Sequence, residues 1–500
     1  MAPWFRPAAG VHVTYAERLK LKCVGPVLCT SRRDEMVVPG IPEVVVSVRS
    51  LKALHPMLRG FLMRTLSSPR WAGIRHGIPL PIRQWVRGRL ERPIRHDLGF
   101  RRTSEWGSDT PTVPDVGSGD GPPNVAAAHG VNLHGYLSRW LGLGECARLY
   151  ANAMLATKYP VSLYDVDIDI PHPRHDRTLA AHLGTASPYR CDLIFVNPDH
   201  WADTLLSAGI STARGRYVIG YWFWELENFP EDWRLAIDQV DEIMVSSAFV
   251  EQAMRRICNK PVTRVPLPLV PGTSDSSLQR HHFGLRDDDY VFFCSFDFNS
   301  TVARKNPQAV IDAFCKAFPR GDEKVSLLIK SSNGNRNTAL LIQLLGAVAR
   351  DARIQLRDDL LERHHLQSLH RCIDVYVSLH RCEGFGLGMA EAMCLGKAVV
   401  ATGYSGNLEF MTPANSCLVD YRMIPVQRGQ YPYADGQQWA DPDPRHAAQH
   451  MRALYQDRTL GSRLGAQAKR DMASNFSVEA CMSVLTRRLR QIDDELQGTA

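Results

Sequence analysis

The sequence has no long hydrophobic run, since none of its apolar stretches reaches the roughly 18–20 residues that a membrane-spanning helix needs. Its first residues also lack the apolar core of a secretory signal peptide. The twelve cysteines are scattered, without paired spacings or accompanying histidine clusters, which argues against a disulfide framework and against a zinc site. We therefore expect a cytoplasmic protein whose thiols are reduced and mostly buried.

The 500 residues are 44% hydrophobic and 22% charged, as in soluble globular proteins, and they exceed what one ordinary core organises. The net charge of +7 is uneven, because residues 1–120 hold 19 basic and 10 acidic side chains while the remainder holds 40 and 42. The densest part, 59–102, interleaves arginine with Leu, Ile and Trp. This pattern suits an anionic membrane surface better than nucleic acid, with a solvated linker or helical hairpin as the alternative.

Short apolar strands alternate with helical stretches from about residue 128 onward, which is typical of parallel α/β sheets. The sequence predicts an α/β fold with two Rossmann-like, doubly wound domains facing a central cleft, where ligands bind at the carboxyl ends of the strands. The predicted strands cover residues 131–133, 161–164, 193–196, 217–219, 243–245, 290–293, 325–329, 353–356, 373–378 and 398–400. The predicted parts are a basic N-terminal extension (1–102), a Gly/Pro/Ser/Asp-rich linker (103–127), an N-terminal domain (128–270), a C-terminal domain (275–475) and a C-terminal helix crossing back (476–497).

The stretch 383–391, Glu-Gly-Phe-Gly-Leu-Gly-Met-Ala-Glu, is the most informative in the chain. Seven residues separate Glu383 from Glu391, between a predicted strand and a predicted helix. The glycines let a ligand approach the main chain closely, and a helix N-terminus favours an anion. The second carboxylate, one turn into the helix, suits ligand hydroxyls. A nucleotide sugar combines both features.

A second cluster places Arg304 and Lys305 on a loop just before a predicted helix. Two adjacent cations beside a helix N-terminus suit a diphosphate, although two solvated surface charges are the alternative. Gly142-Leu-Gly144 is predicted as a glycine turn that opens a helix, with a ligand role or an ordinary tight turn as the two interpretations. We expect no metal site, because the alternating acids Asp165, Asp167 and Asp169 fit a polar strand end.

An aromatic segment, 221–233, contains Trp222, Trp224 and Trp233. Such rings stack well on the C–H surfaces of an acceptor sugar. They fit the core at a strand end equally well, so both interpretations stay open.

Together these motifs resemble a retaining, nucleotide-sugar-dependent glycosyltransferase of the GT-B fold. The resemblance is to the group 1, family 4 type with a Glu-x7-Glu motif, and to its bacterial polysaccharide-biosynthesis subgroup. It covers about residues 128–497. The stretches that carry it are 130–136, 142–148, 220–225, 297–300, 304–307, 377–381 and 403–407.

The resemblance implies that Lys305, with Arg304, neutralises the donor diphosphate while Glu391 holds the ribose. Glu383 and the backbone after it would contact the donor sugar. The implied donor-binding residues are Glu391, Gly384, Phe385, Gly386, Leu387, Asn299 and Gly144, the implied catalytic residues are Glu383, Lys305 and Arg304, and the acceptor-side candidates are Trp222, Trp224 and Glu225.

The chain departs from many relatives at two places. Asn299-Ser300 stands where they carry Gly-Arg, so Arg304 is the substitute cation that we expect. The stretch 221–225 stands where they place a histidine near the reacting carbon.

The resemblance implies transfer of a hexose, with mannose as a candidate, from a nucleotide sugar to a lipid-linked or polysaccharide acceptor. The reaction would need no metal or other cofactor and no enzyme nucleophile, because catalysis comes from positioning and leaving-group stabilisation. We expect no nucleic-acid partner, and a place at the cytoplasmic face of the inner membrane through the basic extension. The alternatives are a GT-B-type sugar-nucleotide epimerase and a non-catalytic sugar-binding or partner-docking protein.

Overall fold

The computed structural model describes residues 35–36, 46–47, 129–168, 170, 172–210, 216–272 and 274–498. Residues 1–101 and 102–500 form two units, which are treated separately. In the first unit, β1 (Glu35–Met36) pairs antiparallel with β2 (Val46–Ser47). The rest of the predicted basic extension, the predicted linker and Asp169 lie outside the described residues. No helix in the described part is both long and apolar enough to cross a membrane.

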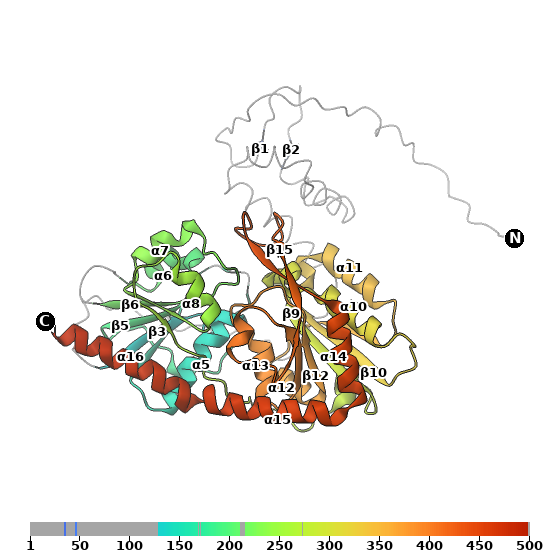
Figure 1. Ribbon diagram of the computed structural model, residues 1–500. Helices are drawn as coiled ribbons and strands as arrows, with labels where there is room; N and C mark the ends of the chain where they lie inside the picture. The colour runs from blue at the N-terminus through green and yellow to red at the C-terminus, as the bar shows by residue number, and fades with distance from the viewer. Residues whose placement is uncertain are drawn as a thin grey trace. The chain divides into compact units, whose positions relative to one another are not determined.

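The N-terminal domain contains a six-stranded parallel sheet in the order β4-β3-β5-β6-β7-β8 (Figure 1). Its central strands β3 and β5 are buried along their whole length, as expected for parallel strands covered on both faces. The strands are β3 (Val131–Gly135), β4 (Val161–Asp165), β5 (Cys191–Phe195), β6 (Tyr217–Tyr221), β7 (Glu242–Val245) and β8 (Val262–Arg264). The helices are α5 (Gly142–Ala156), α6 (Trp201–Ser207), α7 (Arg234–Asp238) and α8 (Ala248–Arg255).

The C-terminal domain repeats this plan with a parallel sheet in the order β11-β10-β9-β12-β13-β14. Its strands are β9 (Tyr290–Asp297), β10 (Val325–Ser332), β11 (Ile354–Asp358), β12 (Val375–Ser378), β13 (Ala398–Thr402) and β14 (Cys417–Val419). Its helices are α9 (Val302–Lys305), α10 (Pro307–Ala317), α11 (Thr338–Val348), α12 (Arg363–Cys372), α13 (Leu387–Cys394), α14 (Pro444–Gln456) and α15 (Arg458–Asn475). An antiparallel pair, β15 (Tyr421–Pro425) and β16 (Gln438–Pro442), follows the last parallel strand.

These two sheets confirm the predicted α/β fold of two doubly wound domains, and every predicted strand overlaps an observed one. The glycine turn predicted to open a helix is the first turn of α5, which begins at Gly142. One local prediction is wrong. Arg304 and Lys305 lie in the one-turn helix α9, which Asn306 ends with a left-handed φ of 51°, and not on an open loop.

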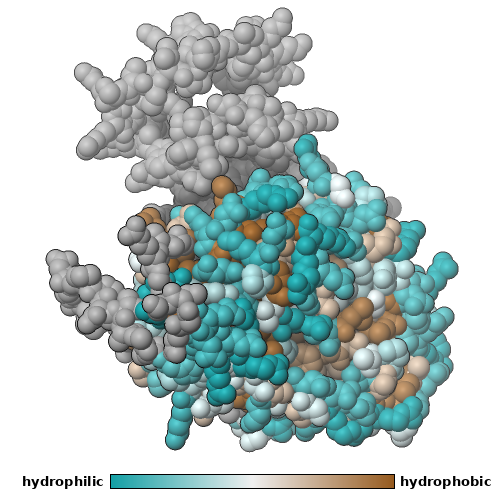
Figure 2. Space-filling model, turned by 60° about the vertical axis from the view of Figure 1, so that its left-hand side comes forward, coloured by the Kyte–Doolittle hydropathy of each residue, from teal (hydrophilic) through white to brown (hydrophobic). Residues whose placement is uncertain are grey.

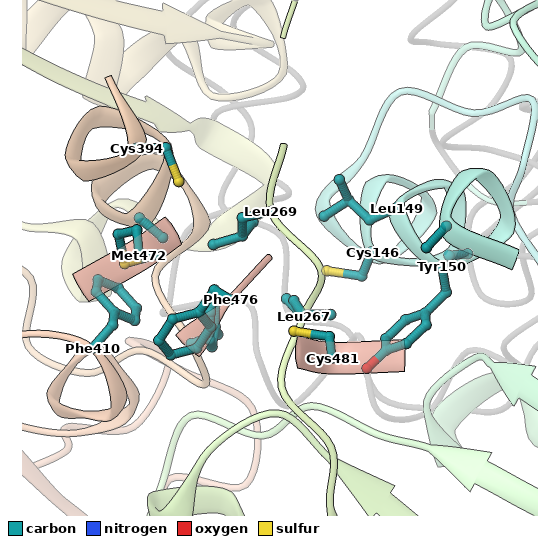
Figure 3. Close-up of a cluster of buried hydrophobic side chains, with 14 of the residues drawn as sticks. Cys146, Leu149, Tyr150, Leu267, Leu269, Cys394, Phe410, Met472, Phe476 and Cys481 are labelled. Atoms are coloured by element: carbon teal, nitrogen blue, oxygen red, sulfur yellow. The ribbon is translucent and has the colours of Figure 1, made fainter. Parts of the chain in front are cut away.

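A linker at residues 265–269 joins the domains and is held on both sides. The Tyr150 hydroxyl donates to the Pro266 carbonyl at 2.5 Å, and the Leu269 amide donates to the Phe476 carbonyl at 2.8 Å. Leu267 and Leu269 belong to a hydrophobic cluster that also takes in side chains of α5, α13 and α15 (Figure 3). One core therefore continues from one domain into the other.

The last helix, α16 (Val478–Gly498), packs against α5 of the N-terminal domain (Figure 1). Its Cys481 joins the cluster around Tyr150 (Figure 3). Arg488 reaches the fully buried Glu242 on β7 at 2.9 Å. The chain thus returns to the first domain after completing the second.

Most of the surface drawn in Figure 2 is hydrophilic, and its hydrophobic residues appear in separate groups. Among the larger exposed apolar side chains are Leu340, Ile342 and Leu345 on α11. Such scattered exposure is ordinary for a soluble fold.

Candidate active site

Glu383 and the Arg304–Lys305 pair come together at the carboxyl ends of two neighbouring strands. Lys305 and Arg304 lie in α9, after β9, and Glu383 follows β12, which pairs with β9. The Lys305 ammonium donates to one oxygen of the Glu383 carboxylate, and Arg304 Nη1 lies 3.0 Å from the other. Two motifs 78 residues apart in sequence therefore form one ionic group.

The Glu383 carboxylate is ionised because of these cations. Burial by itself would raise its pKa, but Lys305 and Arg304 outweigh burial and lower the pKa to about 2. Burial also lowers the pKa of Lys305. The group therefore offers one fixed negative charge between two positive ones.

Arg304 and Lys305 differ in what surrounds them. Arg304 is 4% exposed, and its guanidinium donates to the Cys382 carbonyl at 2.9 Å and lies 3.5 Å from Glu225 Oε1, in addition to Glu383. The side chain of Lys305 is 21% exposed. Lys305 is therefore the more accessible of the two cations, whereas Arg304 is enclosed by protein acceptors, and their expected joint role toward a diphosphate stays a prediction.

Glu225 belongs to the N-terminal domain, on the segment that follows β6. One of its oxygens faces Arg304, and the other accepts the Tyr431 hydroxyl at 2.5 Å. Tyr431 lies between β15 and β16. Glu225 therefore connects the two domains, and its side chain remains 22% exposed, so its expected acceptor role stays a prediction.

Trp222 and Trp224 lie in the core, which is one of the two interpretations left open by the sequence. Their exposed fractions are 0% and 3%. Trp224 packs edge-on against Trp233 and Tyr431, with ring centroids 4.9 and 5.7 Å away. Neither ring presents a face to a ligand in this structure.

The glycine-rich loop after Glu383 is pressed against the N-terminal domain. A Cβ on Gly384 would lie 3.0 Å from the Trp224 carbonyl, and the Gly384 carbonyl accepts the Ser247 hydroxyl at 2.6 Å. Phe385 is buried, Gly386 has a left-handed φ of 98°, and Leu387 begins α13. Only glycine fits the approach at 384 and the backbone at 386.

Glu391 is tied to the other domain through an arginine that the sequence analysis did not single out. Arg363 Nη2 lies 3.0 Å from Glu391, and its Nη1 lies 2.7 Å from Glu145 in the first turn of α5. Arg148 then pairs with Glu145 at 2.8 Å. Burial raises the pKa of Glu391 despite the arginine. Glu391, the predicted ribose-binding residue, is thus linked to the first turn of α5, which contains Gly144, by a series of ion pairs.

Asn299 lies next to Asp297, at the carboxyl end of β9. Its backbone amide donates to the Asp297 carboxylate at 2.7 Å, while its buried side-chain nitrogen has no hydrogen-bond partner among the described residues.

His172 is a residue of the N-terminal domain whose pKa is lowered by burial. The charges of Asp297 and Arg336 also act on it. His172 is a polar group at this boundary that the sequence analysis missed, because no motif marks it.

Within the described residues, Glu362, His364 and His365 have ligand atoms within 4.8 Å of one another. They lie at the start of α12, around Arg363. Carboxylate and imidazole groups are suitable ligands for a divalent transition metal. They take no part in the ionic group at Glu383.

Residues 289–427, which include Lys305 and both glutamates of the 383–391 stretch, match the family model for glycosyl transferases group 1. No curated protein matches the sequence. The structure is similar to HepE from Anabaena in complex with UDP and glucose, at 14% identity and a TM-score of 0.51, over 73% of this chain and all of HepE. It is also similar to sucrose-phosphate synthase from Thermosynechococcus elongatus, at 15% identity and a TM-score of 0.53, over 73% of this chain and 99% of the synthase.

A further match, to TarM from S. aureus, has 12% identity and a TM-score of 0.44 and covers 62% of this chain. The chain spans only 57% of the length of TarM. The matches at a TM-score above 0.5 agree with the two parallel sheets, so the described domains have the GT-B fold.

Proposed function

We propose that the protein is a retaining glycosyltransferase that moves a hexose from a nucleotide sugar to a glycan or lipid-linked acceptor without a metal ion. The observation that carries this proposal is the contact of Lys305 with Glu383, at the carboxyl ends of β9 and β12. The contact lies inside the stretch that matches glycosyl transferases group 1. HepE, which has a similar fold, binds UDP and glucose.

Lys305 is the residue that would meet the leaving diphosphate. Its ammonium has three donors, of which Glu383 takes one, so it can serve a phosphate oxygen and the carboxylate together. Stabilising the charge that develops on the diphosphate lowers the barrier to breaking the sugar–phosphate bond. The acceptor hydroxyl then attacks the same face of the sugar, and its proton passes to the departing phosphate oxygen.

Arg304 and Glu391 have supporting parts in this scheme. Arg304 holds the second Glu383 oxygen, so Glu383 stays ionised and aimed at the hydroxyls of the donor sugar. Glu391, one turn into α13, accepts hydrogen bonds from the ribose hydroxyls.

Mannose is a candidate for the transferred sugar. The basic extension is proposed to hold the enzyme at an anionic membrane.

The first test is a thermal-shift series with GDP-, UDP-, ADP- and dTDP-sugars. We expect one nucleotide to raise the melting temperature of the wild-type protein, because binding to the native state stabilises it. Lys305→Ala should lose this response. Lys324→Ala is the matched control, since Lys324 lies in the same domain and pairs with the exposed Asp288.

The second test measures turnover of the nucleotide that binds. Hydrolysis or transfer should release the nucleotide diphosphate without added metal and in the presence of EDTA, and the first-formed product should keep the anomeric configuration by NMR. The absence of both stabilisation and turnover with every donor would refute the proposal. Formation of an epimeric nucleotide sugar would instead identify the epimerase alternative.

A further inference from the structure

A cavity lies where the two domains meet, and Lys305 is not among the residues that line it. It has a volume of about 300 Å³, and its walls come from α8 and the segment after β6 on one side and from residues 404–409 on the other. These three segments follow the carboxyl ends of β6, β7 and β13. In parallel α/β sheets this is the edge at which ligands bind, and the volume matches the lower range of small-molecule pockets.

The lining of this junction pocket suits a neutral, hydroxyl-rich ligand. The charged side chains of the lining are paired, because Arg256 Nη1 lies 3.8 Å from Glu227 and Arg264 Nη1 lies 3.3 Å from Glu409, so the lining offers no surplus cation to attract a phosphate. Phe249 and Tyr404, whose ring centroids lie 5.5 Å apart, add aromatic surface. Carboxylates beside aromatic rings can satisfy both the hydroxyl groups and the C–H face of a sugar ring.

Several polar groups in the pocket have hydrogen-bonding capacity left. Within the described part of the chain, the exposed side chain of Gln252 makes no hydrogen bond, so its amide offers both donors and an acceptor. Arg256 uses one nitrogen for the Glu227 carbonyl, at 2.9 Å. Tyr404 donates to one oxygen of the Glu227 carboxylate at 3.0 Å, and the other oxygen lies 3.8 Å from Arg256 Nη1, beyond hydrogen-bond distance.

The pocket is next to the candidate catalytic carboxylate. Ser405, which lines it, accepts the Glu383 amide at 2.8 Å, and the Gly406 amide donates to the Glu383 carbonyl at 2.8 Å. A ligand in the pocket would therefore contact Ser405, which is hydrogen-bonded to the Glu383 backbone. It would also touch residues of both domains.

We propose that the junction pocket binds a neutral saccharide unit of the acceptor glycan, an inference that rests on the proposed glycosyl transfer. Gln252 and Arg256 bind its hydroxyl groups, and Phe249 and Tyr404 bind its ring face. The pocket places the acceptor chain beside Glu383, where the transferred sugar arrives.

The test is saturation-transfer NMR of the full chain with three neutral probes, the methyl glycosides of mannose, glucose and galactose. We expect at least one glycoside to bind the wild-type protein, and Gln252→Ala and Arg256→Ala each to weaken that binding by about tenfold, the range for a lost hydrogen bond to a polar or charged group. Arg255→Ala is the matched control. Arg255 is the neighbouring arginine on the same helix, but it pairs with Glu251 at 2.8 Å and does not line the pocket.

Binding of no glycoside, or equal binding by all variants, overturns the proposal. Gln252 and Arg256 are exposed, so the variants should fold, and their melting temperatures check this. The same samples are tested with the nucleotide sugars. A nucleotide response without glycoside binding refutes the pocket alone, whereas glycoside binding without any nucleotide response refutes the proposed donor reaction.

Discussion

At the scale of single residues, two neighbouring cations have unequal surroundings. The side chain of Lys305 is partly exposed, whereas Arg304 is enclosed by Glu383, Glu225 and a backbone carbonyl. A buried guanidinium with three acceptors is fixed in place, and a fixed guanidinium in turn fixes the carboxylates that it contacts. We therefore assign substrate contact to Lys305 and positioning to Arg304.

This division predicts an unusual kinetic signature for Glu225→Gln. The change removes a charge that holds Arg304 from the other domain, so Glu383 should be less well oriented in the transition state. We expect kcat to fall by about tenfold or more, equivalent to about 1.4 kcal/mol, with the donor KM nearly unchanged. Steady-state kinetics with the donor found in the thermal-shift series measures both constants.

Glu231→Gln is the control for that experiment, because Glu231 lies nearby in the same domain but pairs with the exposed Arg234. If Arg304 itself met the diphosphate, Glu225→Gln would mainly change the donor KM. That outcome would contradict the assignment.

At the scale of elements, the first turn of α5 contains two glycines with different surroundings. A Cβ on Gly144 would lie 2.5 Å from the Tyr136 carbonyl, whereas a Cβ on Gly142 would meet nothing within 4 Å. We expect Gly144→Ala to destabilise the protein by about 1–3 kcal/mol through overpacking, and Gly142→Ala to be neutral or slightly stabilising. Melting temperatures of the two variants give the comparison. Equal effects would show that α5 can shift, and that Gly144 is not held by packing.

The contact between α16 and β7 supports a second prediction at this scale. Arg488 is paired with Glu242, which is 0% exposed and also accepts from Tyr217 and Thr263. Removing one partner of a buried pair leaves an uncompensated charge, so Arg488→Ala should cost about 3–5 kcal/mol.

Arg487→Ala is the matched control, because Arg487 is the exposed neighbour on the same helix. Thermal unfolding should separate the two variants clearly. Similar melting temperatures would mean that water reaches Glu242 and that α16 contributes little to holding the N-terminal domain.

The elements that the sequence predicted well are those with strong local signals. The central strand β10 is buried throughout, and its apolar run Leu327–Ile329 is visible from the sequence alone. The three-residue strands β8 and β14 were missed, because such short edge strands have too few residues to show a period. The β15–β16 pair was also missed, and its strands mix polar and apolar residues without an apolar run. The sequence analysis anticipated that Glu383, Arg304 and Lys305 belong to one site, but not that they form direct ion pairs. The Glu225–Tyr431 contact was not, because it joins positions 206 residues apart and no local pattern encodes such a partner.

At the scale of the whole molecule, the two domains are joined by more than the linker. The hydrophobic cluster crosses the boundary, and ionic connections accompany it, among them one through Glu225 and Arg304, one through Glu145, Arg363 and Glu391, and one through Arg264 and Glu409. The first two connections include residues proposed to act on the donor. Domain contact and organisation of the proposed donor site are therefore coupled in this structure.

Arg363→Ala tests that coupling. Without the arginine, the little-exposed carboxylates of Glu391 and Glu145 face each other across the domain boundary without the cation that they share. Arg148 still pairs with Glu145, whereas Glu391 loses its cation. We expect faster hydrogen exchange in the first turn of α5 and a lower melting temperature, because two close like charges repel and a buried carboxylate without a cation is costly. Arg371→Ala, on the same helix but bound to the exposed Ser274 hydroxyl, should change neither.

The defect of Arg363→Ala should also depend on pH. Burial raises the pKa of Glu391, and the arginine opposes that rise, so the variant's pKa should be higher still. A carboxyl group with a raised folded-state pKa destabilises the fold above that pKa, and the penalty disappears below the ordinary value of 4.5. The difference in melting temperature between wild type and variant should therefore be largest near neutral pH and narrow as the pH falls toward 4.5. A difference that stays constant over this range would place the role of Arg363 in packing, and would leave the two domains coupled through Glu225 and the hydrophobic cluster.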